Sequence, residues 1–199
     1  MPGMSNKDIQ GFPGITFECL NDCDIEQCRE LFQELMAFQK SKARIHPEWF
    51  DSMNFETRMK KVHENALEKQ VIVARDNGEP AAYVFTTVDN VEEAHRKRFP
   101  DWASSASGTG FFPDWLELPQ KTGCLRNLYL REKHRGLGIG SMLSDMAMGW
   151  VECFDDVNIT FVYISNGNDD ARMFYEKQGF TFSHDVFDGF ITALFRRSP

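Results

Sequence analysis

Residues 128–143 place three local patterns one after another, and together they restrict the fold more than any other part of the chain. An apolar run that favours a strand, at 128–130, leads into a basic loop and then into a segment with helical period. The loop has glycine at every second position, Gly136, Gly138 and Gly140, which leaves backbone N–H groups uncovered by side chains. A helix that begins there adds partial positive charge, so the loop is predicted to bind an anion, most often phosphate. A tight strand-to-helix turn is the alternative interpretation.

Two well-known phosphate loops do not fit this spacing. The dinucleotide-binding pattern needs two residues between its last glycines, whereas a single residue separates Gly138 from Gly140. A P-loop would close with lysine and then serine or threonine after its last glycine, and this loop does not. The phosphate is therefore expected to belong to another kind of ligand.

A second pattern begins at residue 161. The run Phe161-Val162-Tyr163-Ile164 is β-branched and aromatic and predicts a buried strand. After it, residues 168–180 read Asn-Asp-Asp-Ala-Arg-Met-Phe-Tyr-Glu-Lys-Gln-Gly-Phe. The glycine loop, with its Arg-x-x-Gly-x-Gly spacing, and this second segment resemble the two signature segments of the GCN5-related N-acetyltransferases (GNAT). The resemblance covers residues 120–195, and the N-terminal half fits the family only in its coarse pattern.

The resemblance implies an α/β (α+β) GNAT fold with a mixed, mostly antiparallel central sheet and helices on both faces. It also implies one acetyltransferase domain over residues 1–199. Residues 12–121 would form the N-terminal half, with the helices of the acceptor site and an insert at 90–121, and residues 122–196 the acetyl-CoA-binding half.

The residues themselves predict several elements of that order. A first strand is expected at 15–20, and apolar residues at helical spacing from Ile25 to Met36 indicate a helix. A second helix is expected at about 54–68, with Phe55, Met59, Val62 and Ala66 facing inward. The pair Asn77-Gly78 predicts a hairpin between strands at 71–74 and 81–85, and Asp188-Gly189 predicts another between 181–187 and 190–195.

The resemblance further implies that acetyl-CoA is the acyl donor and that the loop binds its pyrophosphate. In the family the pantetheine arm pairs with the strand before the loop, and a backbone N–H of that strand, here Leu128 or Leu130, stabilises the oxyanion. Asn168 matches the amide that bonds the arm, although a helix N-cap is an alternative role. The expected acetyl-CoA-binding residues are Leu128, Tyr129, Leu130, Arg135, Gly136, Leu137, Gly138, Ile139, Gly140, Ser141, Asn168, Ala171 and Tyr175.

Tyr175 matches the general acid of the family. A phenol stays protonated at neutral pH and can donate its proton to a departing thiolate; the alternative is an ordinary core tyrosine. For the general base, some relatives carry a glutamate where this chain has Cys124 or Arg126, and neither is a natural base. Proton removal is therefore expected through water or through a carboxylate of the insert, with Asp114 and Glu117 as candidates.

The composition of the chain limits the kinds of ligand and partner that it is expected to bind. The formal net charge of −8 argues against nucleic acid or an anionic membrane and is compatible with a cationic substrate, although many soluble proteins share it. Five cysteines without Cys-x-x-Cys spacing indicate neither a disulfide framework nor zinc, and no metal site is expected. Without a signal peptide or an apolar run long enough to cross a membrane, a cytoplasmic protein is expected. Relatives often dimerise, which leaves a homodimer open.

The insert bears on the acceptor. It contains Phe-Pro-Asp-Trp twice, at 99–102 and 112–115, which is either chance or part of a lid that presents aromatic faces and carboxylates to an amine. A covered pocket favours a small-molecule amine acetylated directly in a ternary complex. The alternatives are a protein or peptide N-acetyltransferase and an acetyl-CoA-binding sensor without turnover.

Overall fold

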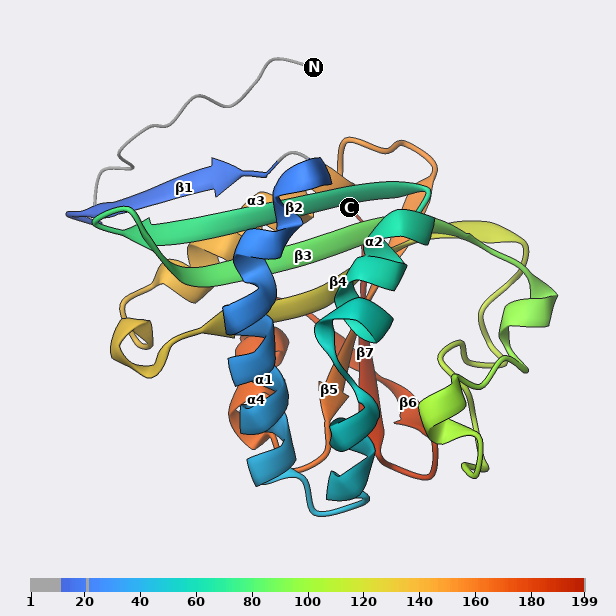
Figure 1. Ribbon diagram of the computed structural model, residues 1–199. Coiled ribbons are helices and arrows are strands. Elements are labelled where there is room, and N and C mark those ends of the chain that lie inside the picture. Colours follow the sequence, from blue (N-terminus) through green and yellow to red (C-terminus); the bar gives the residue numbers. More distant parts are fainter. Residues whose placement is uncertain (1–11, 21, 199) are drawn as a thin grey trace.

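The structure is a computed structural model that describes residues 12–20 and 22–198, so the two ends of the predicted 1–199 domain lie outside it. Within these residues, one seven-stranded sheet has the order β1-β2-β3-β4-β5-β7-β6. Only β4 and β5 are parallel neighbours, and all other neighbours are antiparallel (Figure 1). The strands are β1 (Ile15–Cys19), β2 (Glu68–Asp76), β3 (Glu79–Val91), β4 (Gln120–Leu130), β5 (Val157–Ser165), β6 (Thr181–Val186) and β7 (Ile191–Arg197).

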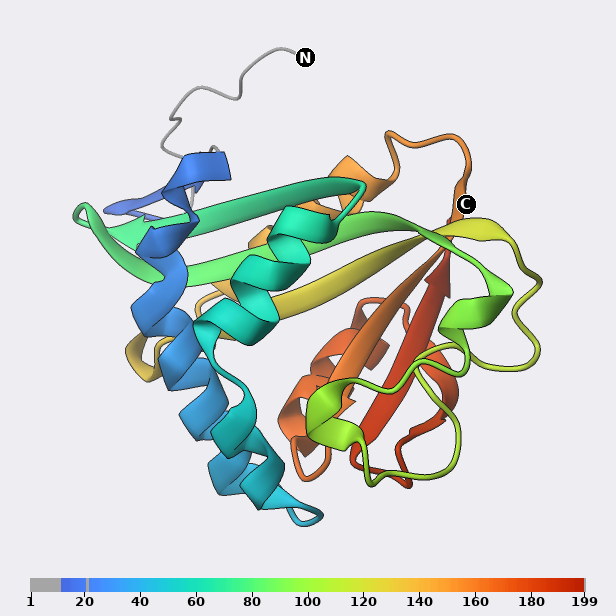
Figure 2. The same ribbon diagram turned by 45° about the vertical axis from the view of Figure 1, so that its right-hand side comes forward.

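Helices cover both faces of this sheet, which confirms the predicted architecture (Figures 1 and 2). The first and second α-helices lie on one face, and the third and fourth lie on the other. The α-helices are α1 (Arg29–Lys42), α2 (Lys61–Asn65), α3 (Ile139–Val151) and α4 (Asp169–Lys177). Shorter helical turns are η1 (Asp22–Cys28), η2 (Pro47–Ser52), η3 (Phe55–Lys60), η4 (Glu93–His95), η5 (Asp101–Ala103) and η6 (Glu132–His134).

A hydrophobic core lies on each side of the sheet. The core under α1 includes Leu31, Phe32 and Leu35 of that helix, as its helical spacing predicts. The core under α3 and α4 includes Leu143 and Tyr175. Because alternate residues of a strand point to opposite faces, β4 and β5 contribute to both cores and hold the two helical layers in one unit.

Both predicted hairpins form. At the first, Asn77 and Gly78 have φ values of 50° and 89°, the left-handed conformation that a two-residue turn between twisted strands requires. At the second, Phe187, Asp188 and Gly189 all have positive φ, and the strands run to Val186 and from Ile191 to Arg197, slightly displaced from the prediction.

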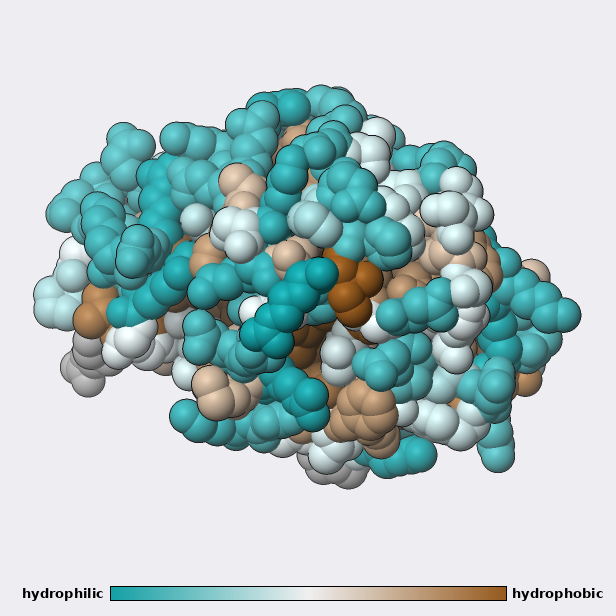
Figure 3. All heavy atoms as spheres, turned by 90° about the horizontal axis from the view of Figure 1, so that it is seen from below, coloured by the Kyte–Doolittle hydropathy of each residue, from teal (hydrophilic) through white to brown (hydrophobic). Residues whose placement is uncertain are grey.

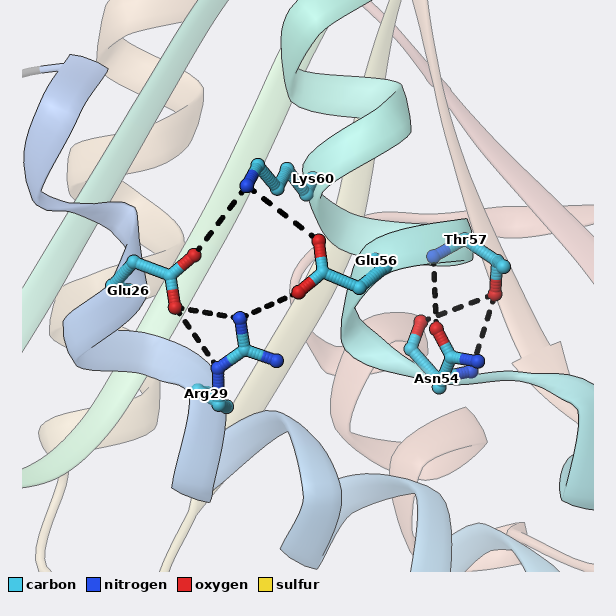
Figure 4. Close-up of polar contacts among 6 residues, drawn as sticks. All are labelled: Glu26, Arg29, Asn54, Glu56, Thr57 and Lys60. Atoms are coloured by element: carbon cyan, nitrogen blue, oxygen red, sulfur yellow. Dashed lines mark hydrogen bonds and ion pairs between the residues drawn. The ribbon is translucent and has the colours of Figure 1, made fainter.

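The second predicted helix is shorter than expected. It begins as the π-helical turn η3, which is capped reciprocally by Asn54 and Thr57 (Figure 4), and it continues as α2 only to Asn65. Ala66 is already extended, and the backbone N–H of Leu67 donates to the Asp89 carboxylate at 3.2 Å. Pairing of Glu68 with Val88 therefore ends the helix, because a strand contact overrides local helix propensity.

The insert occupies residues 92–119, since β3 runs to Val91 and β4 starts at Gln120. It lies over β5, β7 and β6, on the face that carries α1 (Figure 2). Hydrogen bonds attach it there: the Tyr163 hydroxyl donates to the Phe111 carbonyl at 2.7 Å, and Nε2 of His184 lies 3.0 Å from the Gly110 carbonyl. The Phe187 N–H also donates to the Thr109 carbonyl at 3.0 Å. The insert is thus packed against the sheet rather than folded away from it.

Candidate active site

The parallel strands β4 and β5 separate in the middle of the sheet. Their pairing ends at Leu125 opposite Val162, whereas β4 continues to pair with β3 as far as Leu130. Arg126 is an extra residue on β4, a bulge that shifts the register against β3 and bends the strand away from β5. The backbone of residues 126–130 therefore has no strand beside it on the β5 side (Figures 1 and 2).

The glycine loop lies at the end of the separated part of β4. Gly136 and Gly138 have φ values of 74° and 86°, and Gly138 is the N-cap of α3. Among the described turn and cap hydrogen bonds, none uses the N–H of Gly136, Leu137 or Gly138. The N–H groups of the first turn of α3, which have no acceptor within the helix, lie next to them. Together they form the set of donors that a phosphate-binding site requires.

The side chains of the loop have different surroundings. Leu137 is 60% exposed, whereas Ile139 is buried in the core under α3. Arg135 donates from Nε to the Leu130 carbonyl at 3.0 Å, and its guanidinium lies over the Phe38 ring of α1. The predicted loop residues are thus brought together, but Ile139 and Arg135 contact protein groups, and the backbone of Gly136–Gly138 is what faces outward.

Asn168 caps α4, the alternative role that the sequence left open. Its Oδ1 accepts a hydrogen bond from the Ala171 N–H at 3.4 Å, and α4 begins at Asp169. The segment before it is held by Gly167, whose φ of 77° and close approach to the Lys42 carbonyl leave no room for a side chain. This contact joins the end of α1 to the loop between β5 and α4.

Tyr175 of α4 is buried between Phe174 and Phe180, whose rings both meet it edge to face. Burial raises the pKa of Tyr175 far above its usual range, and the nearby Cys124 thiol adds to the rise in pKa. Cys124 pairs with Phe161 one step before the strands separate. The hydroxyl of Tyr175 therefore lies close to the point where β4 and β5 diverge, and it stays protonated.

The other side of this point carries two arginines: Arg126, which the sequence showed only to be no natural base, and Arg58, which the sequence did not single out. Arg126 donates from Nε to the Thr87 hydroxyl at 2.9 Å and from Nη2 to the Asp89 carboxylate at 2.8 Å. Arg58 of η3 lies over the Trp102 ring of the insert, 5.0 Å from its centroid. Both guanidiniums are near enough to the Cys124 thiol to lower its pKa, although burial outweighs them and the pKa is raised.

Asp114 and Glu117 do not come together at this point. Glu117 is exposed and lines a surface cavity with Asn158 and Arg197, at the start of β5 and the end of β7. Asp114 is exposed and close to His184 of β6. The repeated Phe-Pro-Asp-Trp sequence also has no common role, since Trp102 packs against Phe187 and Trp115 packs against Phe195.

Figure 3 views the molecule from below, the side toward which β4 and β5 diverge. It shows a hollow in this face with hydrophobic atoms at its bottom and mostly hydrophilic side chains around it. Across residues 12–20 and 22–198, no cluster of His, Cys, Asp or Glu side chains is arranged to hold a metal ion. In the same part of the chain, no helix has the length and apolar character needed to span a membrane.

A sequence comparison identifies the class of protein that this fold and site define. The family described as "Acetyltransferase (GNAT) family" matches residues 26–180, which is most of the chain. The chain therefore belongs to the GNAT acetyltransferase family and is an N-acetyltransferase of that type, as its two signature segments predicted. No curated protein sequence matches it significantly.

Solved structures agree on the fold. The PaiA N-acetyltransferase of Thermoplasma acidophilum, in complex with coenzyme A, is 16% identical with a TM-score of 0.60, covering 92% of this chain and 99% of that chain. NAA60 of Arabidopsis thaliana, in complex with acetyl-CoA, is 12% identical with a TM-score of 0.58 and coverages of 92% and 99%. The ribosomal-protein-S18-alanine N-acetyltransferase of Escherichia coli is 14% identical with a TM-score of 0.51 and coverages of 91% and 90%. At such identities the likeness concerns the fold alone.

Proposed function

We propose that this enzyme transfers the acetyl group of acetyl-CoA directly to the primary amine of a small molecule. The separation of β4 from β5 beside the glycine loop carries this proposal, because it leaves one strand edge and one anion cradle next to each other. A long ligand with a peptide-like arm and a pyrophosphate fits both features at once.

The residues expected to bind acetyl-CoA follow this geometry. The backbone of Leu128, Tyr129 and Leu130 has no strand beside it on the β5 side and would pair there with the pantetheine arm, although the Leu130 carbonyl already accepts from Arg135. The N–H groups of Gly136–Ser141 would hold the pyrophosphate at the start of α3. Arg135 borders this loop, and Asn168 and Ala171 begin α4 on the far side of the gap.

Tyr175 is the proposed general acid. Its protonated hydroxyl near the divergence point would donate to the departing thiolate, whose conjugate acid has a pKa of about 8.5. The backbone N–H of Leu128 or Leu130 would stabilise the oxyanion. The buried Cys124 thiol has a raised pKa and is a poor nucleophile, so transfer would be direct, without an acyl-cysteine.

Proton removal from the acceptor is assigned to water. Asp89 is the carboxylate that influences the Cys124 thiol, and it is already bonded to Arg126 and Thr87. The insert supports a small acceptor, because Trp102 packs against Trp49 of η2 and Phe190 and covers the α1 side of the sheet.

The test is release of free thiol from acetyl-CoA across a panel of small amines, amino acids and N-terminal peptides, with coenzyme A affinity measured separately by calorimetry. Turnover confined to small amines is the expected result. Activity on peptides alone would contradict the small-molecule acceptor, and coenzyme A binding without turnover on any acceptor would favour the sensor. Failure to bind coenzyme A would contradict the site itself.

A further inference from the structure

Arg58 lies on the turn η3 but takes no part in the ion pairs that the other charged residues of this turn form. The turn η3 is fixed to η1 and α1 by a network on its outer side, in which Arg29 bonds both Glu26 and Glu56 at 2.6 Å (Figure 4). Lys60 joins the same two carboxylates at 3.8 and 3.6 Å. Arg58 takes no part in this network and instead reaches Trp102 of the insert.

The guanidinium of Arg58 has no carboxylate within ion-pair distance among the residues that the structure describes. Its neighbours are an aromatic ring, the neutral Cys124 and a second cation, Arg126. Burial is the larger cause and repulsion from Arg126 the smaller, and together they lower the pKa of Arg58 to about 10. Arg58 is half-buried. A partly desolvated cation without a counter-ion is costly, so an anion that binds beside it would recover part of that free energy.

The region around Arg126 is positive overall because of Arg58. The charge of Arg126 itself is matched by Asp89 at 2.8 Å, so two guanidiniums and one carboxylate leave one net positive charge, which is that of Arg58. Arg126 is the bulged residue where β4 leaves β5, and Cys124 lies two residues before it. The unmatched charge therefore lies beside the proposed point of acetyl transfer, on the face covered by the insert.

We propose that the acceptor is an amine that also carries a carboxylate, and that Arg58 binds this carboxylate beside Trp102. The inference rests on the proposed function and names the class of its acceptor. A guanidinium matches a carboxylate in shape and can bind it with two parallel hydrogen bonds. A single net positive charge matches a monoanion, and the amine of a compact amino acid would then extend from Arg58 toward the free edge of β4.

The experiment compares matched acceptors: common α-amino acids, each against the amine that lacks its carboxylate. For the wild-type enzyme, kcat/KM should be about 10- to 100-fold higher for the amino acid of an active pair, the value of a charge-assisted hydrogen bond. Arg58→Gln should remove this preference by lowering kcat/KM for the amino acid much more than for the amine, so that the ratio of the two kcat/KM values falls to about 1. Arg58→Lys should restore part of the preference.

Lys60→Gln is the matched control, because it removes one positive charge from the same turn but from its outer network. It should leave the preference unchanged, and coenzyme A affinity should be unaltered in all three variants. Equal kcat/KM within every active pair, or a preference that survives Arg58→Gln, would overturn the inference while the proposed function stands.

If no amine is acetylated, the proposed function is wrong, and the role of Arg58 as an anion site is then tested by ligand binding instead of turnover. The coenzyme A complex would then be titrated with N-acetylglycine and with N-methylacetamide, which lacks the carboxylate, and its thermal stability followed. Stabilisation by N-acetylglycine alone, lost in Arg58→Gln, supports an anion site. Absence of that difference overturns it.

Discussion

At the scale of single residues, the site depends on two buried groups that stay neutral, Tyr175 and Cys124, and on one half-buried cation without a counter-ion, Arg58. Tyr175 and Cys124 approach each other from α4 and β4, and burial raises the pKa of both. Arg58 is the opposite case, a cation that burial makes easier to deprotonate. The same desolvation thus favours a proton donor on one side of the divergence point and an anion site on the other.

Replacing Tyr175 with phenylalanine should lower kcat by about 10²- to 10⁴-fold with little change in acetyl-CoA affinity, because only the proton donor is lost. Since burial raises the pKa of Tyr175, wild-type kcat should not decline from its ionisation as the pH approaches the usual tyrosine value of about 10. Steady-state kinetics across pH, with binding by calorimetry, checks both points. An unchanged kcat for Tyr175→Phe at every pH would remove Tyr175 from the mechanism.

At the scale of elements, β4, the glycine loop and α3 form one unit, and in the proposed function the backbone of this unit binds acetyl-CoA. The first turn of α3 starts from Gly138, whose carbonyl accepts from the Met142 N–H at 3.1 Å. A side chain at Gly138 would stand in the cradle, with its Cβ 3.5 Å from the Phe12 ring. The loop therefore excludes side chains both for its conformation and for its ligand.

Gly138→Asp should abolish coenzyme A binding, with a loss of at least about 100-fold, because it places a carboxylate where phosphate would lie. Aspartate tolerates positive φ better than most residues, so the fold should survive. Gly149→Asp is the matched control in the same helix, since nothing lies within 4 Å of the added Cβ there. Calorimetric titration with coenzyme A checks both variants, and tight binding by Gly138→Asp would refute the placement of the pyrophosphate.

At the scale of the whole molecule, the insert joins parts of the chain that are far apart. It reaches β5 through Tyr163, β6 through His184 and the last hairpin through Asp188, whose carboxylate accepts from the Ser107 N–H at 3.2 Å. Arg96 also bonds the Pro113 and Leu116 carbonyls and so holds the insert to itself. The cover over the acceptor side is therefore part of the cooperative fold.

Tyr163→Phe should lower the free energy of unfolding by about 1 kcal/mol, because it removes the hydrogen bond to Phe111 and leaves a carbonyl without that donor. Tyr83→Phe is the contrasting change: the Tyr83 hydroxyl is buried without a hydrogen-bond partner among the described residues, so its removal should be neutral or stabilising. Urea unfolding monitored by circular dichroism measures both. Equal destabilisation of the two variants would contradict this assignment of the Tyr163 bond.

Features of the fold that depend on residues close together in the sequence could be predicted, and features that depend on contacts between distant residues could not. The hairpin at Asn77-Gly78, the strand–loop–helix unit around Gly138 and the helical stripe of α1 depend on neighbouring residues, and all three form as predicted. The length of the second helix was wrong, because its end is decided by the Asp89 side chain and the pairing of β2 with β3. Arg58 gave no signal, since an arginine on an amphipathic helix ordinarily faces water.

By itself, then, the sequence determined the family, the order of strands and helices, and the glycine loop at the start of α3, because glycine spacing and periodic hydrophobicity act within a few residues. The tertiary structure decided where β4 leaves β5, how the insert packs on the sheet, and that Arg58 of η3 and Tyr175 of α4 approach Cys124 of β4. These arrangements join residues far apart in the chain, and packing of the complete sheet and its two helical layers brings them together.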